Sequence, residues 1–219
     1  MTPAQQLYEA IKRGDLTEST ALVAADPSLI EGGGPAGMPP LMLSIYMKQP
    51  AIAEMLLGKG AAMDAYAAAA FGKTDALKAM LAENEALLRE HSSDGWTILH
   101  LACFFGHPET AQMLIEKGAS VHDQSANTLA NKPLHAAVAG RNVEIIALLL
   151  ASGADVNARQ HAGYSALHAA AVNGDEEIVR MLLAHQADPL AGTEKGETPI
   201  SMARDKGHSH VVQLLESAK

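Results

Sequence analysis

The sequence has 219 residues, a formal net charge of −9 and 48% hydrophobic residues, and only eight of its residues are aromatic. A single cysteine excludes a disulfide-stapled scaffold, and the acidic balance argues against a nucleic-acid partner. The longest apolar run, 65–71, is too short to cross a bilayer, and no basic start precedes an apolar stretch. We therefore expect a cytoplasmic protein with no membrane partner.

Along the chain, pairs of short amphipathic helices recur, each pair joined by a tight turn. The predicted turn positions are Gly14, Lys48, Gly72, Gly106, Arg141, Gly174 and Gly207. Most are glycine, which favours a positive φ at the turn. For Lys48 and Arg141 two outcomes stay open, because a left-handed lysine or arginine costs about 1–2 kcal/mol. Either these two residues accept that strain, or their turns are reshaped.

The spacing of the turns shows two irregular units. Only 24 residues separate Lys48 from Gly72, whereas 34 separate Gly72 from Gly106. The third unit therefore starts directly after Asp64 and lacks the hairpin loop that precedes other units. The step from Gly106 to Arg141 is 35 residues, which predicts a longer loop within 125–131.

Four phrases at this spacing carry a family resemblance: Thr97-Ile98-Leu99-His100, Lys132-Pro133-Leu134-His135, Ser165-Ala166-Leu167-His168 and Thr198-Pro199-Ile200-Ser201. With Gly153-Ala154-Asp155-Val156-Asn157-Ala158 at the far end of one unit, they resemble the ankyrin repeat. The resemblance implies an all-α solenoid of stacked helix-turn-helix units with short β-hairpin-like loops. It covers the chain as one domain, 1–219, of about seven repeats: 1–31, 32–64, 65–92, 93–124, 125–159, 160–192 and 193–219.

The same resemblance assigns structural roles to several polar residues. His100, His135 and His168 occupy the position at which the family's imidazole bonds the loop backbone. Tyr8 and Tyr66 take that position in two degenerate repeats, and we expect them to be structural as well. His208 and His210 are expected in solvent, and the other five histidines, His107 among them, in loops and turns.

No pattern for catalysis, metal or cofactor binding stands out. The histidines lack zinc-ligand spacing, and Cys103 falls among small core positions, where it is expected to be a buried apolar side chain. The segment 32–35 is glycine-rich but lacks the strand–helix context of a phosphate loop, so it is interpreted as a loop tip. We predict a non-enzyme without cofactors, although an enzyme with an unrecognised site, or a regulatory subunit, stays open.

The aromatic residues indicate where a partner binds. In proteins that resemble ankyrin repeats, the partner surface is the concave face together with the loop tips. The positions predicted to be exposed there include all three phenylalanines and the only tryptophan. Aromatic residues outside the core are typical of an interaction surface. The predicted partner-binding residues are Tyr46, Met47, Phe71, His91, Asp94, Trp96, Phe104, Phe105, Tyr164 and Asn173.

Two interpretations of these aromatics stay open. The rings bind a protein partner, or they fold over the gap at the shortened repeat and fill it. A notch flanked by 31–38 and 91–96 is also expected there, and a partner segment could insert into it. The predicted function is a monomeric protein-interaction module, and the acidic charge suits a basic partner. The alternative within binding is a stoichiometric inhibitor, or immunity protein, of a toxin or enzyme.

Overall fold

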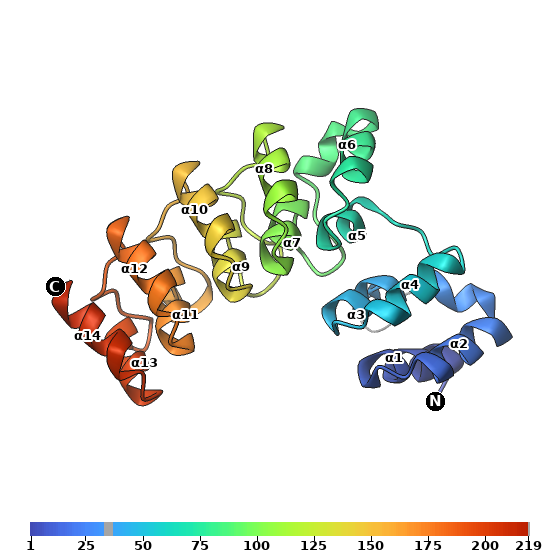
Figure 1. The fold of residues 1–219 in the computed structure, drawn as a ribbon, viewed down its shortest axis with the longest axis horizontal. Helices are drawn as coiled ribbons and strands as arrows, with labels where there is room; N and C mark the ends of the chain where they lie inside the picture. Colours follow the sequence, from blue (N-terminus) through green and yellow to red (C-terminus); the bar gives the residue numbers. More distant parts are fainter. Residues whose placement is uncertain (33–36, 219) are drawn as a thin grey trace.

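The structure is a computed structural model that describes residues 1–32 and 37–218. These residues form fourteen α-helices in seven antiparallel pairs, stacked side by side into an arch (Figure 1). Lys219 and part of the predicted glycine-rich loop tip, 33–36, lie outside the described residues. Helices α5, α7, α9 and α11 line the inner, concave side, and α6, α8, α10 and α12 line the outer side (Figure 1).

The first helices of the pairs are α1 (Pro3–Arg13), α3 (Pro40–Tyr46), α5 (Ala65–Ala70), α7 (Ile98–Phe105), α9 (Pro133–Ala139), α11 (Ala166–Asn173) and α13 (Pro199–Asp205). The second helices are α2 (Leu16–Ala25), α4 (Pro50–Gly58), α6 (Thr74–Glu83), α8 (Pro108–Glu116), α10 (Val143–Ala151), α12 (Glu176–Ala184) and α14 (Ser209–Ser217). Short 3₁₀ turns are η1 (Pro27–Ile30), η3 (Glu85–Leu88) and η4 (His161–Gly163).

Hydroxyl residues are the N-caps of four of the first helices, including Thr2 at the start of α1. Thr97, Ser165 and Thr198 are the N-caps of α7, α11 and α13, and Thr97 and Thr198 accept hydrogen bonds from the backbone N–H groups of the first turn. Such a cap satisfies a donor that the helix itself leaves unpaired. The Ser165 hydroxyl makes no such cap bond and lies 2.8 Å from Nδ1 of His168.

The turns within the pairs are left-handed at each of the seven predicted positions, with φ between 54° and 80°. Lys48 has φ 54° and Arg141 has φ 57°, so neither turn is reshaped. These two residues accept a conformation that glycine adopts freely, because the helices on both sides fix the path of the chain.

The loops between the pairs are hairpin-like, but no β-strand occurs in the described part of the chain. In three of them an N–H bonds the carbonyl four residues later: Ser92 to Trp96, Gln160 to Tyr164 and Thr193 to Glu197. In the fifth unit the same bond joins Ser125 to Asn131, six residues apart, so the longer loop expected there is confirmed. An isolated bridge pairs Arg159 with Ser165.

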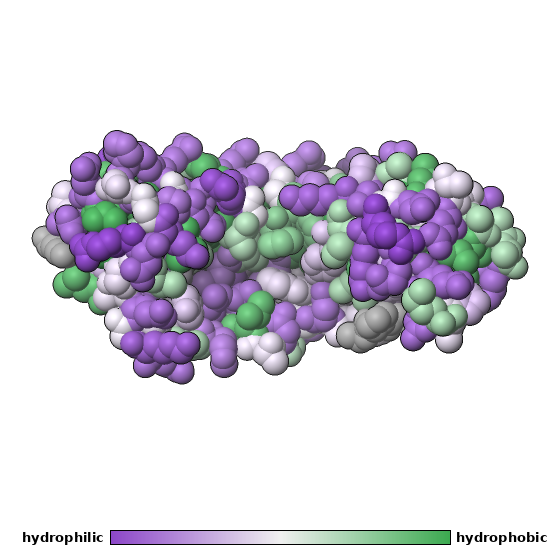
Figure 2. Space-filling view, turned by 90° about the horizontal axis from the view of Figure 1, so that it is seen from below, coloured by the Kyte–Doolittle hydropathy of each residue, from purple (hydrophilic) through white to green (hydrophobic). Residues whose placement is uncertain are grey.

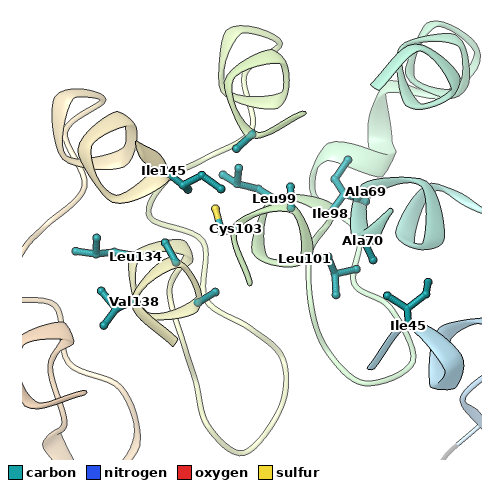
Figure 3. Packing of buried hydrophobic residues seen from close by; sticks show 14 of the residues in the cluster. Ile45, Ala69, Ala70, Ile98, Leu99, Leu101, Cys103, Leu134, Val138 and Ile145 are labelled. Carbon is teal, nitrogen blue, oxygen red and sulfur yellow. The ribbon is translucent and has the colours of Figure 1, made fainter. Parts of the chain in front are cut away.

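The third unit is short because its loop is missing. Helix α4 ends at Gly58, and Asp64 already caps α5 by accepting a hydrogen bond from the N–H of Ala67. Helix α5 consists of alanines apart from Tyr66, and all five alanines are buried. These small side chains let the backbones of α5 and α7 approach closely. Figure 3 shows Ala69 and Ala70 beside Ile98 and Leu101 of α7.

The core is a continuous layer of alanine, leucine, isoleucine and valine between the two rows of helices. Figure 3 shows its centre, where Leu99 and Cys103 of α7 lie on the side of that helix that faces Ile145 of α10 and Leu134 of α9. Because each pair buries its apolar faces only against its neighbours, stacking stabilises the fold. Within the described residues, no helix has the length and apolar character needed to cross a membrane.

Candidate functional site

The ten predicted site residues lie in the inner helices, directly after them, or in the loops that precede them. Met47, His91 and Asn173 are exposed, and Met47 has 40% of its surface accessible. The other seven are half-buried: Tyr46, Phe71, Asp94, Trp96, Phe104, Phe105 and Tyr164. The prediction of exposed aromatics is therefore wrong in degree, because the rings pack against one another and against the core.

Four of these rings form an aromatic cluster, which we define as Tyr46, Trp96, Phe104 and Phe105. The centroid of Tyr46 lies 5.3 Å from Phe105 and 6.5 Å from Phe104, and Trp96 lies 6.3 Å from Phe104. Phe104 and Phe105 meet edge to face at 5.1 Å. Tyr46 belongs to the second helix pair and Phe105 to the fourth, so the cluster spans the shortened unit.

A hydrogen bond strengthens this connection. The Tyr46 hydroxyl donates to Oδ2 of Asp94 at 2.6 Å, and Asp94 also accepts a hydrogen bond from Ser92. Burial, the hydrogen bond to Asp94 and the charge of that carboxylate raise the pKa of Tyr46, so the phenol stays protonated. The loop before α7 is thus tied to the end of α3.

One observation supports each of the two interpretations of the aromatic residues. Tyr46 and Phe105 fill the gap across the shortened unit, as the intramolecular interpretation expects. Yet both residues stay half-buried rather than buried, and exposed Met47 follows Tyr46 directly. Figure 2, which views the arch from below, shows a hydrophobic band near the middle, between hydrophilic surfaces on both sides.

Tyr164 and Asn173 lie apart from the cluster, in the sixth unit. The Tyr164 hydroxyl lies 3.3 Å from Oε2 of Glu197, and its ring lies 5.7 Å from His168. Trp96 contacts His100 in the same way, at 5.4 Å. The two loops therefore place an aromatic ring at corresponding positions of the concave side, and the structure does not join Tyr164 to the cluster.

The three histidines of the repeated phrase are structural, as expected. Nε2 of His100 bonds the carbonyl of Asn131 at 3.0 Å, that of His135 bonds Ala158 at 3.1 Å, and that of His168 bonds Glu197 at 3.2 Å. Burial lowers the pKa of His100 and of His135 to about 4, and it also lowers the pKa of His168. These rings are neutral near pH 7 and join each unit to the next loop.

Two further histidines have structural roles that sequence reasoning missed. His107 and His208 follow turn glycines, and their Nε2 atoms bond the carbonyls of Ala70 and Val172 in the preceding units, at 2.8 and 2.9 Å. The expectation that His208 lies in solvent is wrong. Their position in the repeat could have indicated this role, because the residue directly after the turn is also polar in other repeats, as with Asn142 and Asp175.

The structure also places the groups considered for chemistry. Cys103 is fully buried in α7, and burial raises the pKa of its thiol well above the usual range. Among residues 1–32 and 37–218, no group of three or more His, Cys, Asp or Glu side chains is placed to hold a metal ion. What the inner face presents is a set of aromatic and polar contact groups.

Comparison with known proteins agrees with this architecture. The family model described as "Ankyrin repeats (3 copies)" matches residues 65–160 and 134–219, well over half of the chain. The chain belongs to the ankyrin repeat family. The shortened third repeat lies at the start of the matched region, and the first two helix pairs lie before it.

Curated relatives match parts of the chain. The BCL-6 corepressor-like protein 1 of Homo sapiens is 32% identical over 99 residues, 45% of this chain and 5% of that protein. Ankyrin repeat and SOCS box protein 11 of Mus musculus is 44% identical over 71 residues, 32% of this chain and 21% of that protein. Rabankyrin-5 of Mus musculus is 43% identical over 61 residues, 28% of this chain and 5% of that protein. The chain spans about a fifth or less of these relatives' length. Membership of the ankyrin repeat family supports a protein-interaction module in general.

Proposed function

We propose that this ankyrin-repeat chain binds a partner protein through its concave face, with the aromatic cluster at the centre of the contact. The observation that carries the proposal is the position of the cluster. Four rings from the second and fourth repeats meet on the inner side, half-buried, beside exposed Met47. The proposed activity is binding, without a catalytic step.

Half-burial suits a binding anchor. A ring held by its neighbours loses little conformational freedom when a partner covers its accessible edge, so more of the contact energy appears as affinity. Aromatic residues surrounded by less critical contacts are the usual centres of interface energy. The Tyr46–Asp94 hydrogen bond holds the cluster in place before the partner arrives.

The remaining predicted residues extend the surface along the arch. Phe71 and Met47 adjoin the cluster at the ends of α5 and α3, and His91 lies in the loop before α7. Tyr164 and Asn173 lie two repeats further along. We propose that they contact the same partner at the rim, where single contacts contribute less.

The charge of the chain supports a choice of partner. With a net charge of −9, the surface favours a basic protein partner over nucleic acid, and charge attraction would accelerate association at low salt. We propose a monomer that acts in the cytoplasm, a location in keeping with a single cysteine that is buried.

Two methionine variants test the face directly. M47E together with F71A places a charge and removes a ring on the concave side, whereas M80E places the same charge on the outer helix α6. In affinity capture from the source lysate, quantified by mass spectrometry, we expect M47E/F71A to retain at most about one tenth of the wild-type partner. M80E should retain it. Equal capture by all three proteins, with unchanged circular dichroism, would contradict the concave-face proposal.

A further inference from the structure

A pocket lies where the third repeat lacks its loop. Its volume is about 210 Å³, and its walls include Met38, Met42, Asp64, Tyr66, His91 and Asp94. No hairpin separates the end of α4 from α5, so the start of α3 and the loop before α7 face each other across Tyr66. The notch expected from the sequence is therefore present at its described edges, while 33–36 lies outside the described residues.

The walls combine an apolar surface with two carboxylates. Met38, Met42 and the ring of Tyr66 supply the apolar part, and Asp64 and Asp94 supply the charge. Both carboxylates are already oriented. Asp64 accepts a hydrogen bond from the N–H of Ala67 at 2.7 Å, and Asp94 accepts one from Tyr46 at 2.6 Å.

The charge around this pocket is not balanced by a cation in the described part of the chain. The ion pairs found there are Lys12–Glu9, Arg13–Glu18, Lys78–Asp75, Arg141–Asp175 and Arg204–Glu216, and none includes Asp64 or Asp94. Burial, followed by the charges of Glu90 and Asp64, raises the pKa of Tyr66. This shift agrees with a negative field across the pocket, and His91 already engages the carbonyl of Gln124 through Nε2.

The geometry points to one occupant: the side chain of an arginine from the protein partner. A volume of about 210 Å³ is smaller than the roughly 300 Å³ at which drug-sized ligand sites begin, so it suits a single long side chain. The methionines contact the aliphatic stem. The guanidinium lies against Tyr66 and donates to Asp64 and Asp94, which its planar, forked donors match better than an ammonium does.

This inference rests on the proposed function, because the occupant belongs to the partner that covers the aromatic cluster. Asp94 belongs to both places: it accepts a hydrogen bond from Tyr46 of the cluster and lines the pocket. A partner segment that crosses the cluster passes the mouth of the pocket within the reach of one side chain.

The test uses n-butylguanidinium as the arginine side-chain probe, followed by ¹H–¹⁵N correlation spectra of the full chain. We expect saturable shifts confined to the amides of 64–66 and 91–95, and weaker binding of n-butylammonium. Neutral butyramide should leave these amides unchanged. Equal shifts from butyramide, or shifts spread over acidic residues along the whole arch, would overturn the site, and equal affinity for n-butylammonium would overturn the assignment to arginine.

A variant that removes the two charges provides a second test of the pocket. D64N/D94N keeps the shape and the acceptor oxygens, including the cap of α5, and should weaken n-butylguanidinium binding about five-fold or more. The matched control E54Q/E144Q removes two exposed carboxylates from outer helices and should bind like the wild type. Unchanged affinity in D64N/D94N would overturn the site, and the wild-type probe comparison decides the matter if this variant fails to fold.

The outcomes separate the two proposals. If n-butylguanidinium binds specifically but M47E/F71A captures the partner as well as the wild type does, the concave-face function is refuted and the pocket proposal stands. Capture that depends on the concave face, without specific probe binding, would refute the pocket alone.

Discussion

The C-terminal repeats and the junction between the second and third repeats are held together in different ways. From α7 onward, each unit is joined to the next loop by a buried imidazole, as with His100 and Asn131. At the shortened third repeat there is no loop to receive such a bond. Instead, Tyr46 reaches across to Asp94 and Phe105 of the fourth repeat. The comparison shows that a repeat can lose its loop when aromatic side chains replace the backbone connection.

The turns show the same contrast. His107 and His208 bond carbonyls of the preceding units, and Arg141 pairs with Asp175 of the following one. At the second junction, the corresponding positions hold two lysines, Lys48 and Lys73, and neither side chain makes a hydrogen bond or an ion pair within the described residues. Four experiments test this difference, in order of decreasing expected change.

Acid should destabilise the regular repeats most. His100 and His135 have folded-state pKa values of about 4, below the value of about 6.5 expected when unfolded. The unfolded chain therefore binds protons first, and stability is lost as the pH falls from about 6.5 to about 4, by on the order of 3 kcal/mol for each histidine.

Urea unfolding near pH 7 and pH 4.5 measures this loss, and hydrogen exchange locates it. We expect α7 and α9, which hold His100 and His135, to lose protection before α1 and α5, where Tyr8 and Tyr66 stand in the histidine position. The variant H135Q should show a smaller pH dependence than the wild type. An equal pH dependence in H135Q would contradict the assignment.

Gly140→Ala should disrupt the close approach of α9 to α7. The added Cβ would lie 2.3 Å from the carbonyl oxygen of Phe104, a backbone atom that cannot move away alone. We expect a loss of about 3 kcal/mol in the free energy of unfolding. The control Gly58→Ala meets nothing within 4 Å and should be neutral or slightly stabilising. Similar thermal midpoints for the two variants would be evidence against this close contact.

Tyr46→Phe removes the hydrogen bond that ties the second repeat to the fourth while keeping the ring. We expect a loss of about 1.5 kcal/mol, because the acceptor is a carboxylate. Tyr164→Phe is the matched control, since its contact with Glu197 is long, at 3.3 Å, and its effect should stay below about 0.5 kcal/mol. If the two variants lose the same free energy of unfolding in chemical denaturation, the Tyr46–Asp94 hydrogen bond contributes no more to stability than the Tyr164 contact does.

Lys73→Asp should improve the weak junction. Lys73 is the N-cap of α6 and makes no side-chain cap bond, whereas aspartate at this position can accept one. We expect a gain of about 1 kcal/mol, measured by the thermal midpoint. Lys73→Ala removes the charge without supplying a cap and should change little. A gain of the same size in Lys73→Ala would attribute the effect to charge rather than to capping.

Much of the fold could be predicted because the repeat imposes it locally. Turn positions, caps and the missing loop follow from spacing and from residue types such as Thr97 and Thr198. The left-handed turns at Lys48 and Arg141 were harder to anticipate, since residue preference alone opposes them. There, the stacking of the flanking helices outweighs a local cost of about 1–2 kcal/mol.

The site was less predictable than the fold. Helix register places Phe104 and Phe105 on the inner side, but it does not reveal how close Tyr46 comes across a shortened repeat. That distance depends on the small side chains of α5, which bring α7 near, and on the hydrogen bond to Asp94. The pocket depends on the same long-range approach, so Tyr66 could be interpreted from sequence only as a structural substitute for histidine.

The buried thiol of Cys103 gives the molecule a built-in chemical reporter. It lies in the last turn of α7, and burial holds its pKa far above the range in which thiols are reactive. Maleimide or disulfide reagents can reach it only when the fourth repeat opens. The rate of labelling at this one atom therefore times the opening of the repeat that holds Trp96, Phe104 and Phe105, without any engineered probe.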